Sequence, residues 1–283
     1  MNKMIFGVAV AALLAGCATV SEKGCATLIA HRGESYDAPE NTLPAYQTAV
    51  DRGFGFECDI YLSSDGRVFT FHDTDLKRTT GGVCTQKCWQ ASWADTVSKV
   101  DVGNWGKWKD SKFKGTRPAL LEEVLALARP GRKIYVELKA GPDIVPYVKD
   151  IFAKEPKATP ETVLFISFNA DSCAALKRLM PEYKVYWLTS IRPWKGDAPA
   201  LTADEVIARL RACKADGVDA CFRQDVVTAE FVAAVKKAGF EFHMWTIDDP
   251  AVAEEAFRRG ADTVTTNRAK YILETLRKKG VAL

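Results

Sequence analysis

The chain has 283 residues, of which 47% are hydrophobic and 27% charged, and its formal net charge is +3. This composition excludes an intrinsically disordered chain and fits one large α/β domain or two small ones. Because the net charge is small and no long basic run is present, the sequence predicts no nucleic acid as a partner.

The first residues have the pattern of an export signal. Lys3 precedes an apolar stretch that is too short to span a membrane comfortably and that ends in Leu14-Ala15-Gly16-Cys17. These four residues resemble a bacterial lipobox, which implies cleavage before Cys17 and lipidation of its sulfur. An ordinary signal peptide with a chance cysteine is the alternative. We therefore expect a lipoprotein signal peptide at 1–16, a lipid-anchor linker at 17–26, and an exported protein that faces the periplasm. Ala18 favours the outer membrane, by resemblance to enterobacterial sorting.

Seven cysteines follow Cys17, and in an exported chain some of them can form disulfides. Cys84 and Cys88 lie close together in a loop-like segment, so we predict a disulfide between these two. A zinc site is the alternative, but neither a second cysteine pair nor a nearby histidine completes a set of four ligands. Because seven is odd, at least one thiol is free or bonded to another chain.

Strand-like and helix-like patterns alternate along the rest of the chain. The apolar runs predict eight strands, at 27–31, 56–62, 133–139, 162–168, 184–190, 218–222, 241–247 and 262–266. A helical pattern follows each run, at 42–53, 119–128, 144–155, 172–180, 203–215, 229–239, 251–260 and 269–280, and Asn41 is the expected N-cap of the first helix. Eight such units predict a (β/α)₈ barrel over 27–283. The rival, an open doubly wound sheet, usually has fewer strands, and "HRGESYD" lacks its Gly-rich turn.

The second unit departs from this regularity. Asp65-Gly66 predicts a hairpin turn, and a stretch of about 73–118 without helical or strand periodicity follows it. The stretch contains four of the seven tryptophans. A long insertion in a βα loop of a barrel lies at the catalytic face. We expect the tryptophans to pack a small core of the insertion, and contact with lipid is the alternative.

Charged side chains gather at the ends of the predicted strands. Glu57 and Asp59 are two residues apart, as are Glu137 and Lys139, so each pair points to one side of its strand. Structural ion pairs would leave three carboxylates against one lysine in a low-dielectric place. A hard divalent cation, Ca²⁺ or Mg²⁺, removes this imbalance, because both ions prefer oxygen ligands.

Two histidines lie at the same predicted edge. His31 and Arg32 end the first strand, and His72 follows the hairpin. His31 on its own could be a buried core histidine. Two histidines beside a metal, flanked by Arg32 and Lys139, instead suit phosphoryl transfer, in which one removes a proton and the other donates one.

Several motifs resemble the glycerophosphodiester phosphodiesterase family. They are "AHRG", "PENT", "FECDIYLSSDGRVFTFHDTDLKRTTGG", "ALLEEVL", "VELK", "ISF" and "MWTID", in this order over about residues 28–268. The resemblance implies a (β/α)₈ barrel with a small insertion after strand two. It also implies hydrolysis of glycerophosphodiesters to glycerol-3-phosphate and an alcohol, with one bound divalent cation.

The resemblance also implies roles for single residues. His31 and His72 would be the acid–base pair, although which is the acid stays open, and Glu57, Asp59 and Glu137 would bind the metal. Arg32 and Lys139 would contact phosphate, and Phe168 and Trp245 would line the pocket. The family is thought to use the neighbouring glycerol hydroxyl as an internal nucleophile, which gives a cyclic phosphate.

One departure from the family pattern concerns the last strand, which continues into Asn267 and Arg268 where Thr-Asp-Pro is more usual.

Two alternative functions stay open. One is a phospholipase D-like enzyme that acts on lysophospholipids or sphingomyelin, and the other is a noncatalytic surface lipoprotein that uses the barrel for binding.

Overall fold

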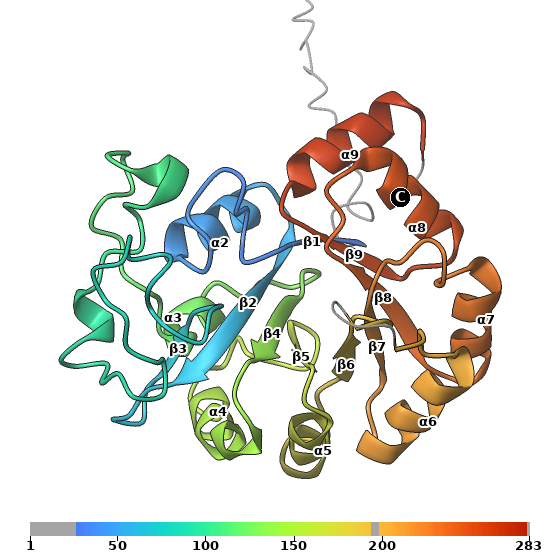
Figure 1. Cartoon of the computed structure of the whole chain (residues 1–283), viewed down its shortest axis with the longest axis horizontal. Coiled ribbons are helices and arrows are strands. Elements are labelled where there is room, and N and C mark those ends of the chain that lie inside the picture. Colours follow the sequence, from blue (N-terminus) through green and yellow to red (C-terminus); the bar gives the residue numbers. More distant parts are fainter. Residues whose placement is uncertain (1–26, 194–197, 282–283) are drawn as a thin grey trace, which may run out of the picture.

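The computed structural model describes residues 27–193 and 198–281, and its centre is a closed parallel barrel (Figure 1). Each barrel strand pairs in parallel with two neighbours, and β1 closes the ring by pairing with both β2 and β9. The barrel strands are β1 (Leu28–Ala30), β2 (Gly55–Leu62), β4 (Ile134–Leu138), β5 (Val163–Ser167), β6 (Val185–Thr189), β7 (Gly217–Cys221), β8 (Glu241–Trp245) and β9 (Thr263–Thr266). The predicted (β/α)₈ barrel is confirmed, and all eight predicted strands are present.

Helices surround the barrel and connect successive strands (Figure 1). They are α2 (Leu43–Asp51), α3 (Leu121–Leu125), α4 (Val145–Phe152), α5 (Ala170–Leu179), α6 (Ala203–Cys213), α7 (Ala229–Lys237), α8 (Pro250–Arg258) and α9 (Ala269–Lys278). The prediction that Asn41 caps α2 is wrong. Thr42 is the N-cap, because its Oγ1 accepts a hydrogen bond from the Ala45 N–H, and the Asn41 side chain points into the barrel instead.

Two apolar layers hold the barrel together. The larger layer lies between strands and helices, which explains why the strands are buried on both faces and read as near-continuous apolar runs. The smaller layer fills the barrel interior with Ile29, Tyr135, Leu164, Ile166, Tyr186 and Leu188. His243 belongs to this interior, because its ring packs against Tyr135 and Tyr186. His243 is therefore a buried core residue, with 2% of its surface exposed.

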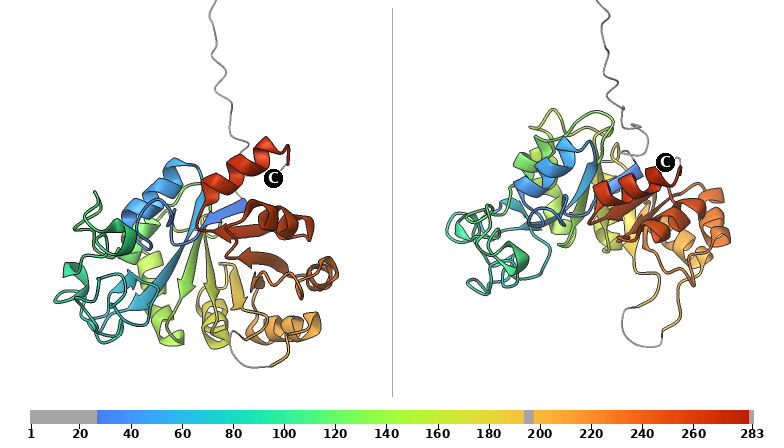
Figure 2. Two further views of the ribbon diagram at one scale, coloured as in Figure 1. Left: turned by 45° about the horizontal axis from the view of Figure 1, so that its top comes forward. Right: turned by 90° about the horizontal axis from the view of Figure 1, so that it is seen from above.

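The insertion lies to one side of the barrel, between β3 (Val68–Thr70) and α3 (Figure 2). β3 pairs antiparallel with β2, as the Asp65-Gly66 turn predicted. Two 3₁₀ helices, Val97–Lys99 and Gly106–Trp108, are its regular elements. The insertion has a small apolar core, which Trp93 joins, whereas Trp89 is 52% exposed. Core packing therefore accounts for Trp93 and not for Trp89.

The predicted disulfide between Cys84 and Cys88 is wrong. Both thiols are free, as are those of the other four described cysteines. The Cys88 thiol is buried in the core of the insertion and donates to the Asp73 carbonyl, whereas Thr80 holds the backbone of Cys84. Closeness in sequence therefore does not bring these two thiols into disulfide geometry.

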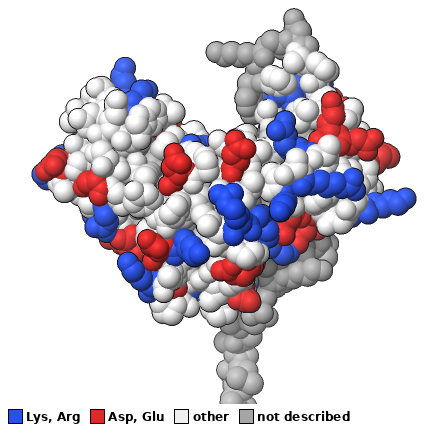
Figure 3. Space-filling view, turned by 90° about the horizontal axis from the view of Figure 1, so that it is seen from below, with Lys and Arg blue, Asp and Glu red and all other residues white. Residues whose placement is uncertain are grey.

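Within the part of the chain that the structure describes, no helix is long and apolar enough to cross a bilayer. The predicted signal peptide, Cys17 and the linker at 17–26 lie outside the described residues. Figure 3 shows Lys and Arg side chains interspersed with Asp and Glu side chains on the face seen from below. Charge on this face is thus balanced locally.

Candidate active site

A pocket of about 230 Å³ opens among the carboxyl ends of the barrel strands. It is lined by eight of the nine predicted pocket residues, His31, Arg32, Glu57, His72, Glu137, Lys139, Phe168 and Trp245. The ninth, Asp59, is fully buried beside Glu57 and Glu137. The Phe168 and Trp245 rings meet edge to face, with centroids 5.6 Å apart, and form an apolar wall. The structure thus brings all nine residues together.

Glu57, Asp59 and Glu137 form a buried carboxylate cluster. One oxygen from each residue lies within 4.8 Å of the others, because β2 and β4 pair in register with Asp59 opposite Glu137. Three buried oxygens, Glu57 Oε1, Asp59 Oδ1 and Glu137 Oε1, have no hydrogen-bond donor among the described residues. Buried carboxylate oxygens that lack hydrogen-bond donors and lie at this spacing fit a hard divalent cation.

The pKa values of the three carboxyl groups show that the cluster lacks positive charge. Burial, followed by repulsion from Asp59, raises the pKa of Glu57 well above its usual value and that of Glu137 to about 7. Burial also opposes ionisation of Asp59, but the charges of Lys139 and Arg32 outweigh it and hold the pKa of Asp59 below its usual value. The cluster therefore holds protons at neutral pH that a divalent cation would displace.

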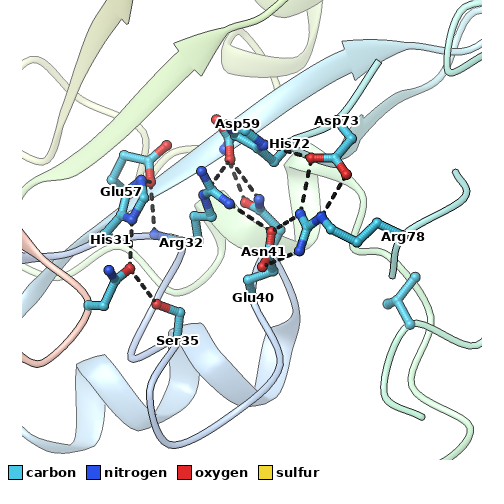
Figure 4. Close-up of polar contacts among 12 residues, drawn as sticks. His31, Arg32, Ser35, Glu40, Asn41, Glu57, Asp59, His72, Asp73 and Arg78 are labelled. Carbon is cyan, nitrogen blue, oxygen red and sulfur yellow. Dashed lines mark hydrogen bonds and ion pairs between the residues drawn. The ribbon is translucent and has the colours of Figure 1, made fainter. Parts of the chain in front are cut away.

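Two cations border the cluster. Lys139 Nζ lies 2.8 Å from Glu137 Oε1 and 3.4 Å from Asp59 Oδ1, outside hydrogen-bond geometry. Arg32 Nε lies 3.4 Å from Asp59 Oδ2, and Figure 4 shows its guanidinium between Asp59 and Glu40. Because three carboxylates face two cations, one negative charge stays uncompensated when all three are ionised.

The backbone turn at "HRG", residues 31–33, positions Arg32 beside the carboxylate cluster. Arg32 and Gly33 both have positive φ, 56° and 78°, and the Arg32 N–H donates to Glu57 Oε2 at 2.8 Å. A Cβ on Gly33 would lie 2.6 Å from the backbone of Ala45, so only glycine fits this turn. The turn after β1 therefore fixes the start of the site against β2 and α2.

His31 is held by a chain of hydrogen bonds from the loops that follow β9 and β8. Its Nδ1 lies 2.7 Å from Asn267 Oδ1, and Asn267 Nδ2 donates to Asp248 at 2.8 Å. Because the amide nitrogen faces a carboxylate, Oδ1 is the acceptor for His31, and the neutral ring then carries its proton on Nδ1. Burial, followed by the nearby Arg32 charge, lowers the pKa of His31 to about 4. At neutral pH, Nε2 is thus an unprotonated base, 4.0 Å from Glu57.

His72 has a different partner. Its Nδ1 lies 2.8 Å from Asp73 Oδ1, and Arg78 holds Asp73 through two hydrogen bonds (Figure 4). The Asp73 carboxylate accepts from the Nδ1–H of His72, which leaves Nε2 for the pocket that His72 lines. The two histidines therefore differ, since an amide oxygen holds one and a carboxylate holds the other.

Asn41, from the "PENT" motif, positions Asp59. Its Nδ2 donates to Asp59 Oδ2 at 2.7 Å, and its Oδ1 accepts from the Asp59 N–H and from the Tyr46 hydroxyl. Asn41 has a φ of 56°, which asparagine tolerates better than most residues. This conformation takes the residue out of the capping position predicted for it.

Sequence reasoning missed three residues of the site. Asn267 and Asp248 hold His31, and Asp219 on β7 lines the pocket with Oδ1 unpaired among the described residues. A signal existed for each, because Asp248 ends "MWTID", Asn267 follows the last strand, and Asp219 is an acidic residue inside a predicted strand. Burial raises the pKa of Asp219 well above its usual value.

The glycerophosphoryl diester phosphodiesterase family model matches residues 31–270. The glycerophosphodiester phosphodiesterase of Caldanaerobacter subterraneus subsp. tengcongensis is 29% identical over 89% of this chain and 98% of its own length. That of Bacillus subtilis is 27% identical over 84% of this chain and 82% of its own.

Among solved structures, an Oleispira antarctica phosphodiesterase in complex with its product sn-glycerol-3-phosphate aligns with a TM-score of 0.75. It is 26% identical, and the match covers 89% of this chain and 96% of that one. The family match spans well over half of the chain. This chain therefore belongs to the glycerophosphoryl diester phosphodiesterase family and is an enzyme of that class, as its motifs implied.

Proposed function

We propose that this enzyme hydrolyses small glycerophosphodiesters to sn-glycerol-3-phosphate and an alcohol, with His31 and His72 as base and acid. The observation that carries the proposal is the pocket itself, where two differently held histidines face a carboxylate cluster and two cations. The Oleispira relative, whose structure contains sn-glycerol-3-phosphate, supports the substrate class.

A divalent cation, Ca²⁺ or Mg²⁺, suits the carboxylate cluster. Glu57, Asp59 and Glu137 would hold it, and it would supply positive charge for the phosphate oxygens and the reacting hydroxyl. Arg32 and Lys139 lie beside the same cluster and would contact the phosphate oxygens, so that charge developing on them is stabilised.

His31 is the base of the first step. Its Nε2 takes the proton from the glycerol 2-hydroxyl as that oxygen attacks phosphorus. His72 donates its Nε2 proton to the alcohol oxygen as the phosphorus–oxygen bond breaks, and a cyclic glycerol phosphate forms. The internal hydroxyl as nucleophile agrees with the lining of the pocket, whose described residues include no serine or cysteine.

The second step uses the same pair in reverse. The neutral His72 now takes a proton from water, which attacks the cyclic phosphate, and the protonated His31 returns its proton to the 2-hydroxyl. The products are sn-glycerol-3-phosphate and the free alcohol, and both histidines regain their starting states. The hydrogen bonds from Asn267 and Asp73 hold the two rings in place through both steps.

The test is release of sn-glycerol-3-phosphate from glycerophosphocholine, followed with Ca²⁺, with Mg²⁺ and with EDTA. We expect release that depends on the cation and that His72→Asn reduces by about 10²-fold or more. Lysophosphatidylcholine run in parallel separates this function from a phospholipase D-like one. Release of choline from the lysolipid, without release of sn-glycerol-3-phosphate from glycerophosphocholine, would contradict the proposal.

We also propose that the protein is exported, anchored at Cys17 and located on the periplasmic face of the outer membrane. The residues before Cys17 and Ala18 support this proposal through their lipobox pattern. The test is mass spectrometry of the protein from bacterial membranes. Acyl chains on Cys17 are the expected result, and a mature chain with an unmodified Cys17 would contradict the proposal.

A further inference from the structure

A second hollow adjoins the catalytic pocket and shares Arg32 with it. We call this hollow of about 440 Å³ the outer groove. Its walls come from four separate segments, the loops after β1, β8 and β9 and the insertion, and include Tyr36, Trp105, Lys107, Trp108 and Arg268. Ser35 and Asn267, which also line it, meet at Asn267 Oδ1, the oxygen that holds His31. The outer groove thus begins where the catalytic base is held.

The two carboxylates of the outer groove, Glu40 and Asp248, already have partners within the chain. Glu40 binds both Arg32 and Arg78. Asp248 accepts hydrogen bonds from Thr266 Oγ1 and from both the backbone and the side-chain amide of Asn267. Two arginines thus offset the charge of Glu40, whereas Asp248 keeps its charge and its oxygens are occupied by neutral donors.

Two cations of the outer groove have no such partner. Among residues 27–193 and 198–281, no carboxylate oxygen lies within 4.0 Å of Lys107 Nζ or of the Arg268 guanidinium. Lys107 Nζ donates to the Tyr36 carbonyl, and Arg268 Nε is buried without a hydrogen-bond acceptor. Three cations, Arg32, Lys107 and Arg268, line the groove against two carboxylates, so its lining carries a net positive charge.

The aromatic rings increase the preference for an anion. An empty aromatic cage would attract a quaternary ammonium group through its ring faces. Here Lys107 lies 4.2 Å from the Tyr36 ring centre and 4.5 Å from that of Trp108. Arg268 covers Tyr36, and Arg78 covers Trp105. Because cations of the protein occupy these rings, a cationic head group would meet like charges.

We propose that the outer groove binds the leaving alcohol of the substrate and selects alcohols that carry an anionic group, a phosphate or a carboxylate. The inference rests on the proposed function, because it assumes a phosphodiester bound between His31 and His72. The alcohol would extend past Arg32 into the groove, where Lys107 and Arg268 pair with its negative group. The enzyme would then prefer anionic glycerophosphodiesters to glycerophosphocholine.

The experiment compares kcat/KM for three substrates with different alcohols, glycerophosphocholine, glycerophosphoglycerol and glycerophosphoinositol 4-phosphate. We expect the anionic substrate to exceed the choline substrate by about tenfold, which corresponds to one charge-assisted contact. The ratio should fall towards one as salt is raised, because partly exposed charges are screened.

The double variant Lys107→Gln, Arg268→Gln tests the residues. We expect it to abolish the anionic preference, mainly through a higher KM for the anionic substrate. Lys109→Gln is the matched control, since it removes a charge from the same insertion outside the groove and should keep the wild-type ratio. Hydrolysis of all three substrates without an anionic preference, or a preference that survives the double variant, would overturn the groove alone. No hydrolysis of any glycerophosphodiester would overturn the proposed function and the groove with it.

Discussion

His31 Nδ1 lies 2.7 Å from Asn267 Oδ1, and this contact gives the two histidines of the site different chemistry. An amide oxygen accepts one hydrogen bond from the neutral ring and adds no charge that would favour the imidazolium. His72 is instead held by the Asp73 carboxylate at 2.8 Å. This difference supports our proposal that His31 is the base and His72 the acid, which the sequence left open.

Replacing Asn267 with alanine should lower kcat for glycerophosphodiester hydrolysis by about 10²-fold, because His31 loses the group that fixes its ring and tautomer. Steady-state kinetics on glycerophosphocholine would measure this effect. Ser35→Ala is the matched control, because Ser35 also donates to Asn267 Oδ1 but does not touch His31. An equal loss in both variants would show that Asn267 has no special role for His31.

The His31 ring should titrate with a midpoint near pH 4 in the cation-free enzyme, because burial and Arg32 disfavour its charged form. Since the pKa is lower in the folded state than in the unfolded state, the unfolded state binds the proton more readily. His31 therefore costs stability as the pH falls from about 6.5 to about 4. Side-chain NMR would report the midpoint, and a value near 6.5 would refute the argument.

Glu137→Gln should stabilise the cation-free protein at high pH. The wild-type carboxyl ionises at about pH 7 when folded but near 4.5 when unfolded, so wild type loses stability as the pH rises between these values. The variant lacks this loss, and we expect its advantage in free energy of unfolding to grow by about 1–3 kcal/mol from pH 4.5 to 8. Denaturant unfolding in EDTA would measure it. A difference that is independent of pH would contradict the assignment.

Affinity for Ca²⁺ or Mg²⁺ should weaken as the pH falls below about 7, because protons then compete for Glu137 and Glu57. Calorimetry at pH 6 and pH 8 would test this directly. Binding that is equally tight at both pH values would mean that the cation does not displace these protons.

Asp219→Asn should leave the fold nearly unchanged. Burial raises the pKa of the Asp219 carboxyl well above its usual value and so favours the protonated form. A neutral amide of the same shape should therefore change the unfolding free energy by less than about 1 kcal/mol. Asp219→Leu introduces a side chain of similar length without polar atoms and would show whether the polar group contacts substrate. A large loss of stability in the asparagine variant would mean that Asp219 is ionised.

The hydrophobic periodicity of the sequence predicted most of the fold, because eight alternating strand and helix units are compatible with few topologies. Strand alternation also brought Glu57 and Asp59, and Glu137 and Lys139, to one side of their strands. It could not show that Asn41 leaves the helix cap for Asp59, since that depends on a local backbone turn. Nor could it pair Asn267 with His31, because more than 230 residues separate them and only closure of the barrel brings β9 beside β1. The predicted disulfide between Cys84 and Cys88 was wrong for a similar reason, because the direction of each thiol depends on how the insertion packs its core.

The measurement that tests the central claim most directly is release of sn-glycerol-3-phosphate by wild type, Glu57→Gln and Glu34→Gln, each with and without added divalent cation. Glu34 is the matched control, since it is equally buried but lies outside the pocket. The account predicts cation-dependent release by wild type and Glu34→Gln, and almost none by Glu57→Gln. Equal release by all three proteins, with cation or with EDTA, would contradict it.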